Sequence, residues 1–317
     1  MKRLAAILAL PCLWLLLPVA SVRADPLDTP LPKPAWERTV GNLRVEKYGS
    51  GNPALILVPG LGCGAWSWRD TVAREAAKHT VYTVTLPGFD GLPPGANDTM
   101  DAAEASLVTL IASEKLVKPV VVGHSLGGTL ALRFGIDHGD LVRGIVSVDG
   151  TPVAPQFASA TPDEVKAAAQ KYHDAIDGES SADFAAGEGK FTADFVTDPT
   201  LAAKVSTLVL RSDQKAIADY GQQLSLIDLR PQLKKLTVPT AMIVPIPGLP
   251  LPSYLPGVMA TMTMDDRRAA SIGFYKGLMN GAPNVTYFPV DNSRHFVMLD
   301  QPVLFAASLD RFVDGLP

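Results

Sequence analysis

The sequence predicts an α/β protein: a mostly parallel sheet with helices on both faces, plus a helical cap insertion. Short apolar runs such as Leu55–Val58 and Val120–Val122 alternate with helical stretches through the first half of the chain. Strands that are apolar throughout are typical of a parallel sheet covered on both faces. The alternation stops at Gly150 and resumes near Val238, which indicates an insertion within the α/β core.

Residues 1–24 have the order of a secretory signal peptide. Lys2 and Arg3 precede an apolar run from Leu4 to Leu17, and small residues lead to Ala24. The run has about 14 residues, whereas a membrane-spanning helix needs roughly 20. We therefore expect cleavage near Ala24, no stable membrane insertion after signal removal, and a periplasmic or secreted protein. An uncleaved membrane anchor is the alternative.

The composition argues against several classes of protein. The chain is 47% hydrophobic and 19% charged, which is too apolar for an intrinsically disordered protein. A formal net charge of -4 leaves no basic excess to bind nucleic acid. Cys63 is the only cysteine after residue 24, so an internal disulfide is impossible in the mature chain. The scattered histidines form no ligand pattern, and neither a metal nor an organic cofactor is expected.

The core is predicted to comprise residues 25–149 and 237–317, and the cap residues 150–236. Four prolines in residues 25–36 favour an extended lead-in arm. A Thr161-Pro-Asp-Glu164 capping box and the pair Asp198-Pro199 begin cap helices. In the core, the expected strands are Leu55–Val58, Val81–Thr85, Val120–Val122, Gly144–Val148, Val238–Val244 and Val285–Val290, and the expected helices include Met100–Leu116, Gly127–His138, Arg267–Met279 and Pro302–Val313.

One motif carries nucleophilic chemistry. Gly123-His-Ser-Leu-Gly127 lies between a predicted strand and a predicted helix, which is the context expected of a G-x-S-x-G nucleophile elbow. Glycines on either side allow a tight turn that leaves the hydroxyl of Ser125 exposed at the edge of the sheet. The helix that follows favours negative charge in front of its N-terminus. Ser125 is therefore the candidate nucleophile.

A serine hydroxyl needs a base, normally a histidine held by a carboxylate. His295 follows the strand Val285–Val290 by a short loop, so it is expected at the same sheet edge as Ser125. The other histidines lie near helix ends, in the cap, or beside the nucleophile. His295 is therefore the candidate base.

With these motifs the chain resembles the α/β-hydrolase fold superfamily with an inserted helical cap. Gly123–Gly128 resembles its nucleophile elbow, and Ser293–Phe296 with Asp300–Pro302 resembles its histidine loop, with Arg294 where glycine is more usual. Val58–Gly62 resembles the loop after the third strand, with Pro59 in place of the usual histidine. The resemblance implies an oxyanion hole formed by the backbone N–H groups of Leu61 and Leu126.

The acid departs from the family pattern. Most members carry an aspartate directly after the strand that here ends at Val244, but residues 245–252 contain no carboxylate. Asp149 follows the preceding strand, where some members, haloalkane dehalogenases among them, carry the acid. Asp265 or Asp266 lies about 30 residues before His295, although Thr263–Asp266 also has the pattern of a capping box. Asp149 is favoured, and Asp266 or Asp265 is the alternative acid.

The residues and the resemblance together predict a serine hydrolase that cleaves a carboxylic ester or related acyl bond through an acyl-enzyme. The expected partner is a small-molecule, hydrophobic, ester-like substrate. Other chemistries on the same fold, namely those of a perhydrolase, a C–C hydrolase, an amidase or a lactonase, are the alternatives. A non-catalytic ligand-binding protein with the same fold is the alternative from another class.

Overall fold

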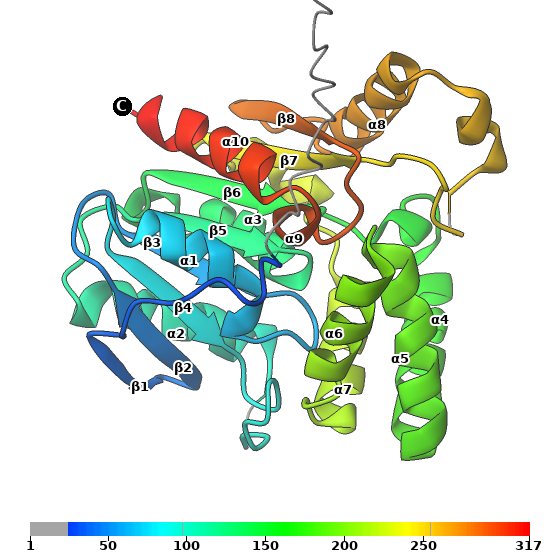
Figure 1. Cartoon of the computed structure of the whole chain (residues 1–317), viewed down its shortest axis with the longest axis horizontal. Helices are drawn as coiled ribbons and strands as arrows, with labels where there is room; N and C mark the ends of the chain where they lie inside the picture. The colour runs from blue at the N-terminus through cyan, green and yellow to red at the C-terminus, as the bar shows by residue number, and fades with distance from the viewer. Residues whose placement is uncertain (1–24, 97, 254) are drawn as a thin grey trace, which may run out of the picture.

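The computed structural model describes residues 25–96, 98–253 and 255–317, and the predicted signal peptide lies outside them. Within these residues the core is one eight-stranded sheet with the order β1-β2-β4-β3-β5-β6-β7-β8 (Figure 1). The strands from β4 to β8 across the sheet are parallel, while β2 is antiparallel to both β1 and β4. The strands are β1 (Trp36–Val40), β2 (Leu43–Tyr48), β3 (Leu55–Val58), β4 (Val81–Thr85), β5 (Val120–His124), β6 (Gly144–Val148), β7 (Thr240–Ile246) and β8 (Val285–Asp291).

Helices cover both faces of the sheet, as predicted (Figure 1). Every residue of β3, β4, β5 and β6 is buried, which is why these strands are mostly apolar on both faces. One face carries α1 (Arg69–Glu75), α9 (Val297–Asp300) and α10 (Pro302–Asp314), and the other carries α2 (Met100–Ser113), α3 (Leu126–Asp137) and α8 (Met264–Leu278).

The hairpin of β1 and β2 is absent from the sequence prediction. The three central residues of β1 are exposed, and β2 alternates between buried and partly exposed positions. An edge hairpin with one solvated face has charged residues at alternate positions, so it lacks the continuous apolar run that identified the other strands. The predicted arm over residues 25–36 therefore ends where β1 begins, at Trp36.

Strand β7 is displaced from its predicted bounds and continues through Pro245. Its pairing with β6 ends at Ile243, opposite Val148, whereas its pairing with β8 continues to Ile246. Beyond Ile243 the strand has a partner on one side only. A proline without an N–H is tolerated at such a position.

Four helices lie between β6 and β7, in the segment predicted to form the cap. They are α4 (Pro162–Gly178), α5 (Ser181–Phe195), α6 (Pro199–Val209) and α7 (Gln214–Leu226). Helix α4 packs on α7, and α5 packs on α6. The Thr161–Glu164 capping box begins α4, and the carboxylate of Asp198 caps α6. Figure 1 shows these helices beyond the carboxyl ends of the parallel strands, where ligands bind in open α/β sheets.

Candidate active site

The chain turns sharply from β5 into α3 at Ser125. Its φ is 54° and its ψ is -118°, a strained conformation for a residue with a side chain. A Cβ atom on Gly123 would lie 1.9 Å from the carbonyl oxygen of Gly127, so only glycine fits there. The N–H of Ser125 donates to the carbonyl oxygen of Val148 at 2.9 Å. These constraints hold Ser125 at the carboxyl edge of the sheet.

The loop after β3 lies directly against Ser125. A Cβ atom on Gly60 would lie 2.8 Å from Nδ1 of His124 and 3.2 Å from Cβ of Ser125. Leu61 follows Gly60, and Leu126 is the first residue of α3, where backbone N–H groups have no partner within the helix. The two segments predicted to supply oxyanion donors therefore meet at the candidate nucleophile. The positive end of the α3 dipole adds to their attraction for an anion.

His295 is paired with Asp149. Its Nδ1 lies 2.5 Å from Oδ2 of Asp149, which follows β6 and has a φ of 49°. The hydroxyl of Tyr275 donates to the other carboxylate oxygen, Oδ1. Because the carboxylate fixes the proton on Nδ1, Nε2 of a neutral His295 is left as a proton acceptor. This is the arrangement that a general base requires.

The alternative acids lie elsewhere. The hydroxyl of Thr263 donates to Oδ2 of Asp266 at 2.7 Å, and the N–H of Asp266 donates back to that hydroxyl. Asp265 forms an ion pair with Arg268 at 2.5 Å and is largely exposed. Both aspartates therefore belong to the N-terminal turn of α8. Of the three candidate acids, the structure brings Asp149 to His295.

His124 holds the backbone of His295 in place. Its Nε2 lies 3.0 Å from the carbonyl oxygen of His295, and the two rings are 4.6 Å apart. A carbonyl can only accept, so Nε2 carries the proton. Complete burial lowers the pKa of His124 well below its ordinary value, and the neighbouring His295 lowers it further. A neutral His124 therefore donates to the segment that carries the candidate base.

Asp300 organises the histidine loop. Its Oδ2 accepts from the N–H of Arg294 at 2.7 Å, and its Oδ1 accepts from both the N–H and the hydroxyl of Thr197. Burial raises the pKa of Asp300, and the bonds from Thr197 and Arg294 oppose that shift. Because Thr197 follows α5, one carboxylate connects the loop to the cap.

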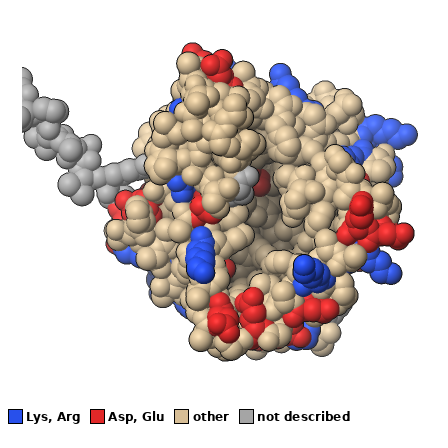
Figure 2. Space-filling model, turned by 90° about the vertical axis from the view of Figure 1, so that its right-hand side faces the viewer, with Lys and Arg blue, Asp and Glu red and all other residues tan. Residues whose placement is uncertain are grey.

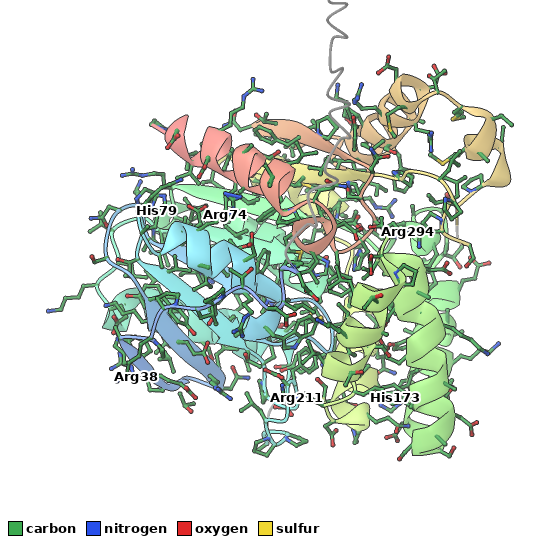
Figure 3. The ribbon with its side chains drawn as sticks, viewed as in Figure 1. Arg38, Arg74, His79, His173, Arg211 and Arg294 are labelled. Carbon is green, nitrogen blue, oxygen red and sulfur yellow. The ribbon has the colours of Figure 1, made fainter. Side chains whose placement is uncertain are left out.

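Arg294 makes a second connection to the cap. Its guanidinium donates to the carbonyl oxygens of Ala193 and Val196, at the end of α5, and to that of Pro250 (Figure 3). The ring of Phe195 lies 4.7 Å from the ring of His295 in an edge-on contact. The end of α5 is thus fixed against the candidate base. Figure 2 shows a hollow on the side of the molecule that carries α4 and α5.

Two residues of the site, Tyr275 and His124, are absent from the candidates predicted from the sequence. Tyr275 lies 126 positions from Asp149 along the chain, and no local pattern connects the two. His124 is part of the elbow motif, but the sequence does not show that its side chain points toward the backbone of His295. The bond between Asp300 and the histidine loop had one sequence indication, which was the Asp300-Gln-Pro302 pattern that resembles the family's histidine loop.

Comparison with known families gives a match to the model of the alpha/beta hydrolase family over residues 55–308. This chain belongs to that family. The match begins at β3 and ends within α10, so it includes Ser125, Asp149 and His295. The family membership agrees with the resemblance drawn from the elbow and the histidine loop.

Relatives of this alpha/beta hydrolase include enzymes of different activity. A pimeloyl-[acyl-carrier protein] methyl ester esterase of Proteus mirabilis is 32% identical over 107 residues, which are 34% of this chain and 40% of that protein. A 2-hydroxy-6-oxononadienedioate/2-hydroxy-6-oxononatrienedioate hydrolase of a Pseudomonas species is 26% identical over 129 residues, 39% of this chain and 46% of that protein. The chain therefore matches less than half the length of each of these two relatives.

Solved structures share the fold of this alpha/beta hydrolase. MenH from S. aureus superposes with a TM-score of 0.68 at 15% identity and covers 85% of this chain and 97% of its own. A thermophilic esterase from Thermogutta terrifontis gives a TM-score of 0.67 at 17% identity, covering 88% and 98%. At these identities the likeness establishes the fold alone.

No helix in residues 25–96, 98–253 and 255–317 has both the length and the apolar character to cross a membrane. In the same part of the chain, no group of three or more His, Cys, Asp or Glu side chains is placed to hold a metal ion.

Proposed function

We propose that this alpha/beta hydrolase is a serine hydrolase that cleaves a carboxylic ester or related acyl bond through an acyl-enzyme. The observation that carries the proposal is the pairing of His295 with Asp149 beside the elbow that holds Ser125. A nucleophile, a base and an acid that orients the base are the groups that acyl transfer needs.

In the first half of the proposed reaction, Oγ of Ser125 attacks the ester carbonyl carbon while Nε2 of His295 takes the hydroxyl proton. The carbonyl oxygen becomes an oxyanion that accepts from the backbone N–H groups of Leu61 and Leu126. A donor of this kind typically contributes about 10²–10³-fold in rate. The tetrahedral intermediate then expels the alcohol, which takes the proton from His295, and the acyl group stays on Ser125.

In the second half, water attacks the acyl-enzyme. Nε2 of His295 takes a proton from the water, and the same N–H groups hold the second oxyanion. Collapse of this intermediate breaks the bond to Oγ, releases the carboxylic acid and returns the proton to Ser125. Asp149 and Tyr275 keep the ring of His295 in one orientation through both halves.

The proposed substrate is a small ester with a hydrophobic portion. Phe195 borders His295, and Phe191 lies 4.1 Å from Phe195 between ring centroids. The P. mirabilis relative is named as a methyl ester esterase, which supports ester cleavage. The other hydrolytic chemistries of the fold remain the alternatives that a substrate screen would separate.

Export is a separate proposal. We propose that residues 1–24 direct the chain out of the cytoplasm and are cleaved near Ala24, which leaves a periplasmic or secreted enzyme. Sequencing the N-terminus of the protein recovered from a periplasmic extract tests this. A chain that starts at Met1 and remains in the cytoplasmic fraction would contradict it.

The deciding experiment is covalent labelling of the purified mature protein with a fluorophosphonate, followed by intact mass. One adduct is expected on the wild-type protein and none on Ser125→Ala or His295→Ala. Unlabelled wild-type protein would then be assayed with p-nitrophenyl esters of graded chain length. A folded wild-type protein that acquires no adduct would contradict the proposed function and favour ligand binding without catalysis.

A further inference from the structure

The face of α5 that points into the molecule carries a carboxylate. Phe184 and Thr192 on this helix are buried, and Glu188, which is partly buried, lies one turn from each. Phe195, seven residues after Glu188, contacts the ring of His295. At a rise of 1.5 Å per residue, Glu188 lies about 10 Å from that contact along the same side of the helix.

The charge of Glu188 raises the pKa values of residues in two other segments. Burial is the main cause that raises the pKa of Tyr172 on α4, and the charges of Glu188 and, after it, Glu179 add to the shift. Burial likewise raises the pKa of the Cys63 thiol, and the charge of Glu188 is the next largest cause. Cys63 comes two residues after Leu61, and its thiol is 3.5 Å from the carbonyl oxygen of Leu61. The charge of Glu188 therefore acts on groups of both α4 and the loop predicted to form the oxyanion hole.

Among the described residues, the partner of the Glu188 carboxylate is a hydroxyl group and not a cation. The hydroxyl of Thr192 donates to its Oε1 at 2.7 Å. Within the part of the chain that the structure describes, no lysine, arginine or histidine is ion-paired with it, and burial raises its pKa. A partly buried carboxylate without a counter-ion destabilises a fold unless a donor reaches it. Its second oxygen is available to such a donor from a ligand.

We propose that Glu188 selects substrates whose acyl chain ends in an ammonium group. The ester carbonyl would lie at Ser125, and the chain would extend along the inner side of α5 past Phe195 to the carboxylate. Phe195 and its neighbours contact the methylene part of the chain, and Glu188 accepts from the terminal ammonium. This inference rests on the proposed acyl-transfer function and adds a substrate class to it.

The test compares two p-nitrophenyl esters of nearly equal size. The ε-aminocaproate carries a terminal ammonium, and the heptanoate carries a methyl group in its place. Wild-type enzyme is expected to show a kcat/KM ratio that favours the aminocaproate. Glu188→Gln, which keeps the shape but removes the charge, is expected to lower this ratio about 10- to 100-fold, the range for a hydrogen bond to a charged group.

The matched control is Glu179→Gln. It makes the same chemical change at the exposed end of α4, so it removes one unit of charge from the cap without touching the inner face of α5. The ratio is expected to stay within about twofold of the wild-type value. An equal fall in both variants would attribute the preference to the overall field of the cap and overturn the proposal.

A second measurement needs neither a variant nor turnover. Hexylammonium is expected to slow fluorophosphonate labelling of wild-type protein at about tenfold lower concentration than hexanol does. Equal protection by hexylammonium and hexanol, or an unchanged ester ratio in Glu188→Gln, would overturn the role of Glu188. If the wild-type protein still labels, the proposed function is not affected by that result. Failure of wild-type protein to label at all would instead overturn the proposed function and this inference with it.

Discussion

Asp149 decides the orientation of His295 at the scale of single residues. An asparagine would present an amide where Nδ1 now meets a carboxylate at 2.5 Å and would favour the wrong tautomer of the ring. Asp149→Asn is therefore expected to lower kcat/KM for a p-nitrophenyl ester by up to about 10⁴-fold. Steady-state hydrolysis measures the effect, with circular dichroism to show that the variant is folded.

The control is Asp266→Asn, which changes the same side-chain type at the first turn of α8. Its carboxylate accepts from Thr263, so the substitution is expected to weaken a helix cap by about 1 kcal/mol and to leave turnover nearly unchanged. The opposite pattern, with activity lost in Asp266→Asn and kept in Asp149→Asn, would move the acid to α8.

Tyr275 supports Asp149 from helix α8. Tyr275→Phe removes the donor to Oδ1 of Asp149 and leaves the bond to His295 in place. We expect kcat to fall about 3- to 10-fold with little change in KM, the size of one hydrogen bond. A fall as large as that of Asp149→Asn would mean that Tyr275 takes part in the proton transfer itself.

The sequence identified candidate residues that make strong local patterns. Ser125 was recognisable from the glycines that its turn requires, and His295 from its place after the last strand. Three aspartates satisfied the rules for the acid, and the choice among them needed distances. Tyr275 made no pattern at all, because its partner is remote in the chain and a buried tyrosine on α8 could equally have been an ordinary core residue.

At the scale of elements, hydrogen bonds from Arg294 connect the histidine loop to the cap. Arg294→Met keeps most of the side-chain length but removes the bonds to three carbonyl groups. We expect KM to rise several-fold and amide exchange over residues 193–197 to become faster, because the end of α5 loses its attachment beside His295. Enzyme assays and hydrogen-exchange mass spectrometry measure the two effects.

Arg311→Met is the matched control for Arg294. Arg311 is exposed in the last turn of α10, and its removal is expected to alter neither KM nor exchange at the end of α5. If Arg294→Met also left both unchanged, the bonds of Asp300 to Thr197 and Arg294 would be sufficient to hold the cap.

Elements were predictable where burial leaves a strong pattern. The central strands are buried at every position and mostly apolar, and α4 and α6 begin at recognisable caps. The β1–β2 hairpin escaped prediction because half of its side chains face solvent. The tie between Arg294 and α5 was also beyond the sequence, since it depends on backbone carbonyl groups that any residue could supply.

At the scale of the whole molecule, Glu104 couples stability to pH. It lies on α2, where its Oε2 is 2.8 Å from Nε of Arg133 on α3. Its buried Oε1 has no hydrogen-bond partner among the residues that the structure describes. Asp101, Asp137 and His138 also face it. Burial is the main cause that raises the pKa of Glu104 from 4.5 to about 7; Arg133 opposes the shift, and the two aspartates add to it.

The direction of the effect follows from proton binding. Between pH 4.5 and about 7 the folded chain holds a proton on Glu104 that the unfolded chain has lost, so stability falls as pH rises through this window. Glu104→Gln cannot ionise and avoids this loss. Relative to wild type, we expect the variant to gain about 2 kcal/mol of unfolding free energy between pH 5 and pH 8.

Urea unfolding of both proteins at pH 5 and pH 8 measures that gain, and Glu114→Gln is the contrasting control. Burial by itself raises the pKa of Glu114, but hydrogen bonds from Lys47 and Tyr82 outweigh it and hold the pKa below 4.5. The stability that Glu114 contributes is therefore lost only below that pH, and between pH 5 and pH 8 the difference between Glu114→Gln and wild type should stay constant. The unfolding free energies of Glu104→Gln and wild type are expected to diverge over the same interval. If they instead change in parallel with pH, Arg133 keeps Glu104 ionised throughout.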